Sequence, residues 1–98
     1  MDVRFDDDTL RRLEVDGDFN GGFGREVVRG FRKAMQAIRA APDTRDLYAM
    51  KSLHFEKLKG ARSHQHSIRL NRQWRLIVEL ERSANGRLVI VVSIEDYH

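Results

Sequence analysis

Cationic and titratable side chains of the kind that handle phosphate groups gather in the second half of this 98-residue chain. RNA can be cut without a metal ion through its own 2′-hydroxyl, which attacks the adjacent phosphate. A base must then take up the hydroxyl proton, and an acid must protonate the leaving oxygen. Histidine can fill either role, and arginine offers a permanently charged, planar donor group for the phosphate. The residues that could share this chemistry are His54, Lys57, Lys59, Arg75, Tyr97 and His98.

The charge of the chain is segregated, although its net value is only +3. Residues 51–82 carry eight Lys and Arg residues against three Glu, whereas residues 1–18 carry seven acidic residues against three Arg. Concentrated basic charge attracts polyanions, and nucleic acids are held largely through phosphate contacts from Lys and Arg. The alternative interpretation is a solvated basic face. On the nucleic-acid interpretation, the residues predicted to contact RNA are Lys57, Arg62, Arg69 and Arg72.

The composition and the motifs disfavour several classes of protein. The absence of Cys excludes disulfides, thiolate catalysis and Cys-based zinc sites. Because no apolar run approaches ~18 residues and the N-terminus lacks a signal-peptide pattern, we expect a cytoplasmic protein without a membrane span. No phosphate-binding glycine loop, dinucleotide fingerprint or serine-hydrolase elbow is present. His64 and His66 have the spacing of two ligands on one strand face, but no third ligand is evident, so we predict neither a metal nor a cofactor.

The first part of the chain has the pattern of a short strand and a short helix. Residues 3–5 could form the strand. The acidic run 6–8 can then cap a helix that turns Leu10 and Leu13 inward. The glycine-rich residues 17–24 are typical of a loop.

Residues 25–41 predict a longer helix, which Pro42 ends. Apolar residues recur there at spacings of three and four, which is one helix face, and arginines and a lysine occupy the remaining positions. Asp43 or Thr44 can cap one further helical turn. The apolar face consists of Val28, Phe31, Met35 and Ile38.

From about residue 53 the apolar residues alternate with polar ones, which is the period of a β-strand. A first long strand is expected to carry His54, Lys57 and Lys59. Strands at 66–70 and 74–81 follow, separated by a polar turn at 71–73.

The last predicted strand, residues 88–94, is apolar on both faces, which is typical of a central strand covered on each side. Asn85-Gly86 predicts the hairpin that leads into it. Helices first and strands afterwards indicate an α+β fold, with N-terminal helices packed on one face of a mainly antiparallel sheet. The length favours a single domain over residues 1–98.

Four short motifs in the second half resemble the HigB branch of the RelE/ParE toxin superfamily, and the resemblance extends over roughly residues 25–98. It implies a RelE-like fold with a curved sheet and a toxin of a type II toxin–antitoxin system. It further implies ribosome-dependent, metal-independent mRNA cleavage and a cognate antitoxin, commonly a helix-turn-helix, HigA-like protein, through which alone operator DNA is bound. The motifs are Leu58-Lys59-Gly60, Ser67-Ile68-Arg69-Leu70-Asn71, Gln73-Trp74-Arg75-Leu76 and Glu95-Asp96-Tyr97-His98.

The resemblance assigns roles to four residues. Arg75 matches the arginine that stabilises the phosphate, and Lys59 matches the lysine that binds the phosphate or stabilises its charge. Tyr97 and His98 match the C-terminal pair that lines the site. His98 is the candidate for proton transfer, and Tyr97 is a positioning group or an acid.

The chain departs from the family pattern at the histidine that usually stands three residues before the lysine. Glu56 occupies that position here, and His54 lies two residues further back. On a regular strand His54 would face away from Lys59, whereas Lys57 would share its face. Either a bulge restores the convergence, or another base acts.

Two other functions remain open within the same superfamily. ParE-like members inhibit DNA gyrase by binding rather than by cutting, and a toxin-fold protein without activity could serve only as a co-repressor. The pair Tyr97 and His98 favours the nuclease, because a binding protein needs no proton donor at this place.

Overall fold

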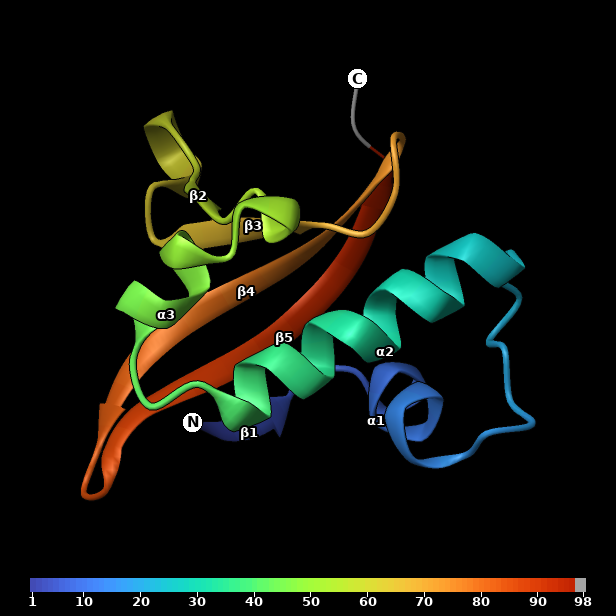
Figure 1. The fold of residues 1–98 in the computed structure, drawn as a ribbon, viewed down its shortest axis with the longest axis horizontal. Coiled ribbons are helices and arrows are strands. Elements are labelled where there is room, and N and C mark those ends of the chain that lie inside the picture. Colours follow the sequence, from blue (N-terminus) through green and yellow to red (C-terminus); the bar gives the residue numbers. More distant parts are fainter. Residues whose placement is uncertain (97–98) are drawn as a thin grey trace.

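The computed structural model describes residues 1–96 and shows helices packed on one face of a five-stranded, strongly curved sheet (Figure 1). The helices are α1 (Asp8–Val15), α2 (Arg25–Ala40) and α3 (Thr44–Ala49), with two 3₁₀ turns, η1 (Lys51–Leu53) and η2 (Gly60–Arg62). The strands are β1 (Asp2–Phe5), β2 (Glu56–Lys57), β3 (Gln65–Arg69), β4 (Trp74–Ser83) and β5 (Gly86–Asp96). Among the described helices, none combines the length and the apolar character that crossing a bilayer requires.

The strand order is β1-β5-β4-β3-β2, so the strand predicted to be central, β5, lies between β1 and β4. β5 pairs with β1 in parallel and with β4 antiparallel, and β3 and β2 continue the antiparallel part. The predicted α+β fold with a mainly antiparallel sheet is therefore confirmed. The predicted hairpin joins β4 to β5, where Gly86 takes a φ of 119°.

The two faces of the sheet are covered differently. The face toward α2, which we call the inner face, carries the apolar core. On the opposite, outer face, Ile77 and Ile90 are only 3% and 2% exposed, although they do not belong to that core. β5 therefore has buried residues on both faces, as predicted, but the described helices cover only the inner face of the sheet (Figure 1).

Helix α2 forms where the periodicity predicted it, because its apolar stripe is buried against the sheet. The four predicted residues Val28, Phe31, Met35 and Ile38 are all buried. Between them, Gly30 lies so close to the backbone of Leu70 that a Cβ atom at this position would clash with the carbonyl oxygen. Because of this close approach, α2 is packed directly against the end of β3.

Two of the acidic residues that were predicted to cap helices, Asp7 and Asp43, do so. The side chain of Asp7 accepts a hydrogen bond from the Thr9 amide at the start of α1. Asp43 and Asp46 form a reciprocal capping box at the start of α3. A cap of this kind satisfies amide groups that have no partner inside the helix.

Two arginines of α2 hold the N-terminal helix and the glycine-rich loop in place. Arg39 makes a two-pronged contact of 2.7 Å with both carboxylate oxygens of Glu14. Arg32 donates to the carbonyl oxygens of Leu13, Asp16 and Phe19. These side chains therefore have structural partners within the chain.

The prediction of a long strand from residue 53 is wrong. The amide of His54 donates to the carbonyl oxygen of Lys51, which closes the turn η1, and His54 itself takes a left-handed φ of 47°. Pairing with β3 begins only at Glu56 and ends at Lys57. The alternation that suggested a strand arises because Leu53 and Phe55 are both buried, on either side of this left-handed residue.

Candidate active site

A hollow of about 300 Å³ lies at one end of the outer face, and we call it the Arg75 hollow. Arg75 lies on β4, directly opposite Arg69 on β3 and Glu95 on β5. Lys59 reaches the same hollow from the segment between β2 and η2. The sequence prediction that Lys59 and Arg75 converge is therefore met. The lining residues are Leu58, Lys59, Arg62, Ser67, Arg75, Ile77, Glu95 and Asp96.

A second hollow, of about 790 Å³, contains His54 and not Lys59, and we call it the His54 hollow. Nη1 of Arg69 lies 3.3 Å from Nε2 of His54. A guanidinium group can only donate, so Nε2 of His54 is the acceptor in this contact. His54 has a left-handed backbone and contacts Arg69, and it does not line the Arg75 hollow. The lining residues are Glu26, Ser52, His54, Arg69, Leu70, Asn71, Arg72 and Gln73.

The expectation that Lys57 shares a face with Lys59 is wrong. Lys57 pairs with His66, whereas Glu56 pairs with Ser67, which lines the Arg75 hollow. Directly opposed residues of an antiparallel pair point to the same face, so Glu56 rather than Lys57 faces the side of Arg75. Glu56 is an exposed carboxylate, and sequence reasoning did not assign it a role. The sequence signal that could have identified Glu56 was its position three residues before Lys59. The structure adds that β2 contains only two residues.

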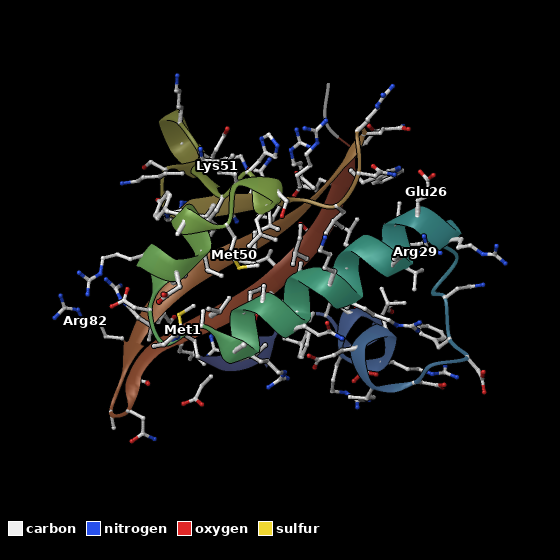
Figure 2. All side chains as sticks on the ribbon, in the orientation of Figure 1. Met1, Glu26, Arg29, Met50, Lys51 and Arg82 are labelled. Carbon is white, nitrogen blue, oxygen red and sulfur yellow. The ribbon has the colours of Figure 1, made fainter. Side chains whose placement is uncertain are left out.

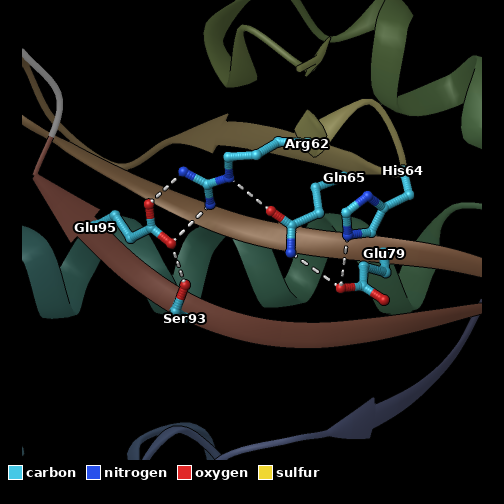
Figure 3. Close-up of polar contacts among 6 residues, drawn as sticks. All are labelled: Arg62, His64, Gln65, Glu79, Ser93 and Glu95. Carbon is cyan, nitrogen blue, oxygen red and sulfur yellow. Dashed lines mark hydrogen bonds and ion pairs between the residues drawn. The ribbon is translucent and has the colours of Figure 1, made fainter. Parts of the chain in front are cut away.

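A chain of polar contacts crosses the outer face beside the Arg75 hollow (Figure 3). Both carboxylate oxygens of Glu95 accept hydrogen bonds from Arg62, over 2.9 and 2.8 Å, and Oγ of Ser93 donates to one of them. The contact with Arg62 lowers the pKa of the Glu95 carboxyl. Arg62, predicted to contact RNA, therefore already holds a carboxylate. Sequence reasoning missed Glu95, because only the register places it opposite Arg75.

The contacts continue from Arg62 along β3 and β4. Nε of Arg62 donates to Gln65 over 2.9 Å, and the amide nitrogen of Gln65 donates to Glu79 over 3.0 Å. His64 lies 3.9 Å from the same carboxylate of Glu79. This chain fixes the side chains that border the hollow.

The two histidines at 64 and 66 do not form a ligand pair. His64 precedes β3 and reaches Glu79, whereas His66 stacks on Phe55 with ring centroids 4.9 Å apart. Burial, with a smaller contribution from the charge of Lys57, lowers the pKa of His66. Over residues 1–96, no three His, Asp or Glu side chains come close enough together to hold a metal ion.

The remaining predicted residues lie at the edges of these two hollows. Arg72 is exposed in the turn between β3 and β4 and lines the His54 hollow. The predictions for Tyr97 and His98 fall outside the described residues. The last described residue, Asp96, lines the Arg75 hollow and accepts a hydrogen bond from Gln73 over 2.9 Å.

Comparison with known proteins agrees with this fold. The family model for the HigB-like toxin, described as the RelE-like toxin of the type II toxin–antitoxin system HigB, matches residues 3–98. Among solved structures, the YoeB/ParE toxin from Agrobacterium tumefaciens is similar, with a TM-score of 0.57 and 15% identity over 100% of both chains. The YoeB-YefM complex from Staphylococcus aureus contains a similar chain, with a TM-score of 0.59 and 17% identity over 100% of this chain and 97% of the other.

No curated protein matches the sequence. The two structural neighbours are similar in fold and distant in sequence, whereas the family model covers nearly the whole chain. The chain therefore belongs to the HigB-like family of RelE-like toxins of type II toxin–antitoxin systems.

Proposed function

We propose that this toxin is a ribosome-dependent endonuclease that cleaves mRNA and so inhibits translation. The observation that carries the proposal is the convergence of Lys59 and Arg75 in one hollow on the outer face. Two cations placed there can hold a phosphate and stabilise the charge that develops as it is attacked. The action of such an enzyme on ribosomes locates it in the cytoplasm.

In the proposed reaction the RNA supplies its own nucleophile. The 2′-hydroxyl oxygen forms a bond to the adjacent phosphorus while the bond from phosphorus to the 5′-oxygen breaks. The products are a 2′,3′-cyclic phosphate and a 5′-hydroxyl, and no metal ion is needed to generate the nucleophile. Arg75 and Lys59 donate to the non-bridging oxygens of the pentavalent transition state.

Proton transfer requires a base for the 2′-hydroxyl and an acid for the leaving oxygen. Glu56 faces the side of Arg75 and is exposed, so its carboxylate is a candidate for the base. We propose His98 as the acid and Tyr97 as the group that positions the leaving oxygen or donates in its place. His54 lies in the neighbouring hollow and is the less favoured proton acceptor.

The proposal includes a cognate antitoxin. One structural neighbour is described as a YoeB-YefM complex, which supports a protein partner of this type. We propose a helix-turn-helix, HigA-like antitoxin that silences the toxin and mediates any contact with operator DNA.

The test maps the 5′ ends of transcripts in a translation extract after addition of the wild-type toxin. We expect new ends within translated regions, each carrying a 5′-hydroxyl. Arg75→Ala should slow cleavage by about 10²–10³-fold, because one donor to the transition state is lost. Arg82→Ala is the matched control, since Arg82 is exposed beside the β4–β5 hairpin, at the far end of the sheet (Figure 2).

A second function is kept open by one structural neighbour, which is described as a YoeB/ParE toxin. A ParE-like protein would inhibit DNA gyrase, and a plasmid supercoiling assay would detect that inhibition. Gyrase inhibition without transcript cleavage contradicts the nuclease proposal. Absence of both activities, and of growth arrest on expression, would leave the role of an inactive co-repressor.

A further inference from the structure

The Arg75 hollow and the His54 hollow share a rim. Nε of Arg69 and Nη1 of Arg75 each donate to the carbonyl oxygen of Asn71, both over 3.3 Å. Gln73, from the His54 hollow, donates to Asp96, from the Arg75 hollow. An extended strand of RNA that enters one hollow can therefore continue into the other.

The turn that carries this rim is held by internal hydrogen bonds. The side-chain oxygen of Asn71 accepts hydrogen bonds from the backbone amides of Gln73 and Trp74, over 2.9 and 2.8 Å. The carbonyl oxygen of Asn71 is thereby held where both arginines reach it. This internally bonded turn lines the His54 hollow.

Arg69 keeps its positive charge available for a ligand. Its two contacts among residues 1–96 are with Nε2 of His54 and the carbonyl oxygen of Asn71, and neither partner is a carboxylate. Arg62, by contrast, is bound by both carboxylate oxygens of Glu95. A phosphate can therefore bind Arg69 without first displacing a carboxylate.

The backbone conformation of His54 also supports a role in ligand binding. A left-handed conformation is unfavourable for a residue with a side chain and tends to occur at functional sites. Here the left-handed residue is the one whose imidazole contacts the guanidinium of Arg69. Imidazole rings and guanidinium planes are the groups on which unpaired RNA bases stack.

One carboxylate, that of Glu26 in the first turn of α2, also lines the His54 hollow (Figure 2). Its negative charge disfavours a phosphate on that wall. The phosphate of a bound nucleotide would therefore lie on the side of Arg69, with its base between the imidazole and α2.

We propose that the His54 hollow is a nucleotide-binding subsite, which takes the nucleotide next to the scissile phosphate. Arg69 binds its phosphate and His54 stacks on its base, so that His54 acts in substrate binding and not in proton transfer. This inference rests on the proposed nuclease function.

The test measures single-turnover cleavage of mRNA on programmed ribosomes over a range of toxin concentrations, for the wild type, His54→Phe, His54→Asn and Arg69→Ala. His54→Phe keeps a flat ring without a titratable nitrogen, so any loss should appear in the half-saturating concentration rather than in the saturated rate. His54→Asn suits the left-handed backbone but lacks the ring. We expect His54→Asn and Arg69→Ala each to raise the half-saturating toxin concentration about tenfold or more. Both should also redistribute the cleavage sites.

Three outcomes overturn the inference. A loss of about 100-fold in the saturated rate of His54→Phe, with unchanged half-saturation, would make His54 a proton-transfer group. Unchanged half-saturation and cleavage sites in both His54→Asn and Arg69→Ala would remove the subsite while leaving the nuclease in place. A wild-type toxin that cleaves nothing would overturn the proposed function together with the subsite. Arg69→Ala leaves residue 54 untouched, so it tests the phosphate contact of the subsite even where His54→Phe does not fold.

Discussion

Arg69 and Arg75 stand directly opposite each other on β3 and β4, and their guanidinium groups donate to one acceptor, the carbonyl oxygen of Asn71. Like charges in directly opposed positions of a sheet are destabilising. A shared acceptor offsets part of this repulsion, and an anion bound between the two groups would offset more. The pair is therefore suited to a ligand with closely spaced negative charges, such as the backbone of RNA.

Lys59 and Lys57 provide a matched pair of variants for the site. Lys59→Ala should slow mRNA cleavage by about 10²-fold, because Lys59 lines the hollow of Arg75. Lys57→Ala should have a much smaller effect, because Lys57 pairs with His66 and points to the inner face. Single-turnover rates of the two variants test this, and equal losses would contradict the assignment of the two lysines to different faces.

Glu95→Gln should strengthen the binding of single-stranded RNA, because it removes a negative charge from the hollow and releases Arg62 from its ion pair. One additional phosphate contact would steepen the slope of log affinity against log salt by about 0.7. Binding measured across a salt series tests this change. The contact with Arg62 lowers the pKa of Glu95, so the carboxylate is ionised near neutral pH. The contribution of this ion pair to the stability of the fold is therefore lost only as the pH falls into the acid range. Glu81→Gln, at an exposed position of β4, is the control and should leave the slope unchanged.

Gly30→Ala should destabilise the fold by roughly 1–3 kcal/mol, although alanine is normally preferred in a helix. The added Cβ atom would clash with the carbonyl oxygen of Leu70 and force α2 away from the end of β3. Urea denaturation measures the loss. Gly17→Ala is the control, because a Cβ atom there meets nothing within 4 Å. Equal stability of the two variants would argue against the close packing of α2.

His66→Phe should make the stability of the protein less dependent on pH. Burial lowers the pKa of His66 in the folded state below its unfolded value of about 6.5, so folding favours the neutral ring. The stability that this ring contributes is complete above pH 6.5 and is lost as the pH falls through the folded pKa. As the pH falls below about 6.5, the free energy of unfolding of the wild type should therefore decrease relative to that of His66→Phe.

The control for this experiment is His64→Gln, since His64 is exposed and lies beside Glu79. It should keep the loss of stability in acid. Parallel stability curves for the wild type and His66→Phe between neutral pH and pH 5 would show that His66 is not responsible.

The elements whose pattern spans several turns or residues could be predicted from the sequence. The apolar stripe of α2, with Phe31 and Met35 at its centre, and the apolar run of β5 both formed where their periods placed them. Such patterns are reliable because burial of one stripe or one strand favours a single local structure. The motifs that contain Lys59 and Arg75 also indicated the family, which the family model then matched over residues 3–98.

Only the tertiary structure decided how the segment around His54 is arranged. The buried Leu53 and Phe55 have the alternation of a strand, and the sequence could not show that a left-handed residue stands between them. The pairing of Glu95 with Arg62 and of Arg69 with Arg75 depends on strand register, which is set by contacts between segments far apart in the chain. The types of chemical group were thus determined by the sequence, whereas their assignment to two neighbouring hollows came from folding.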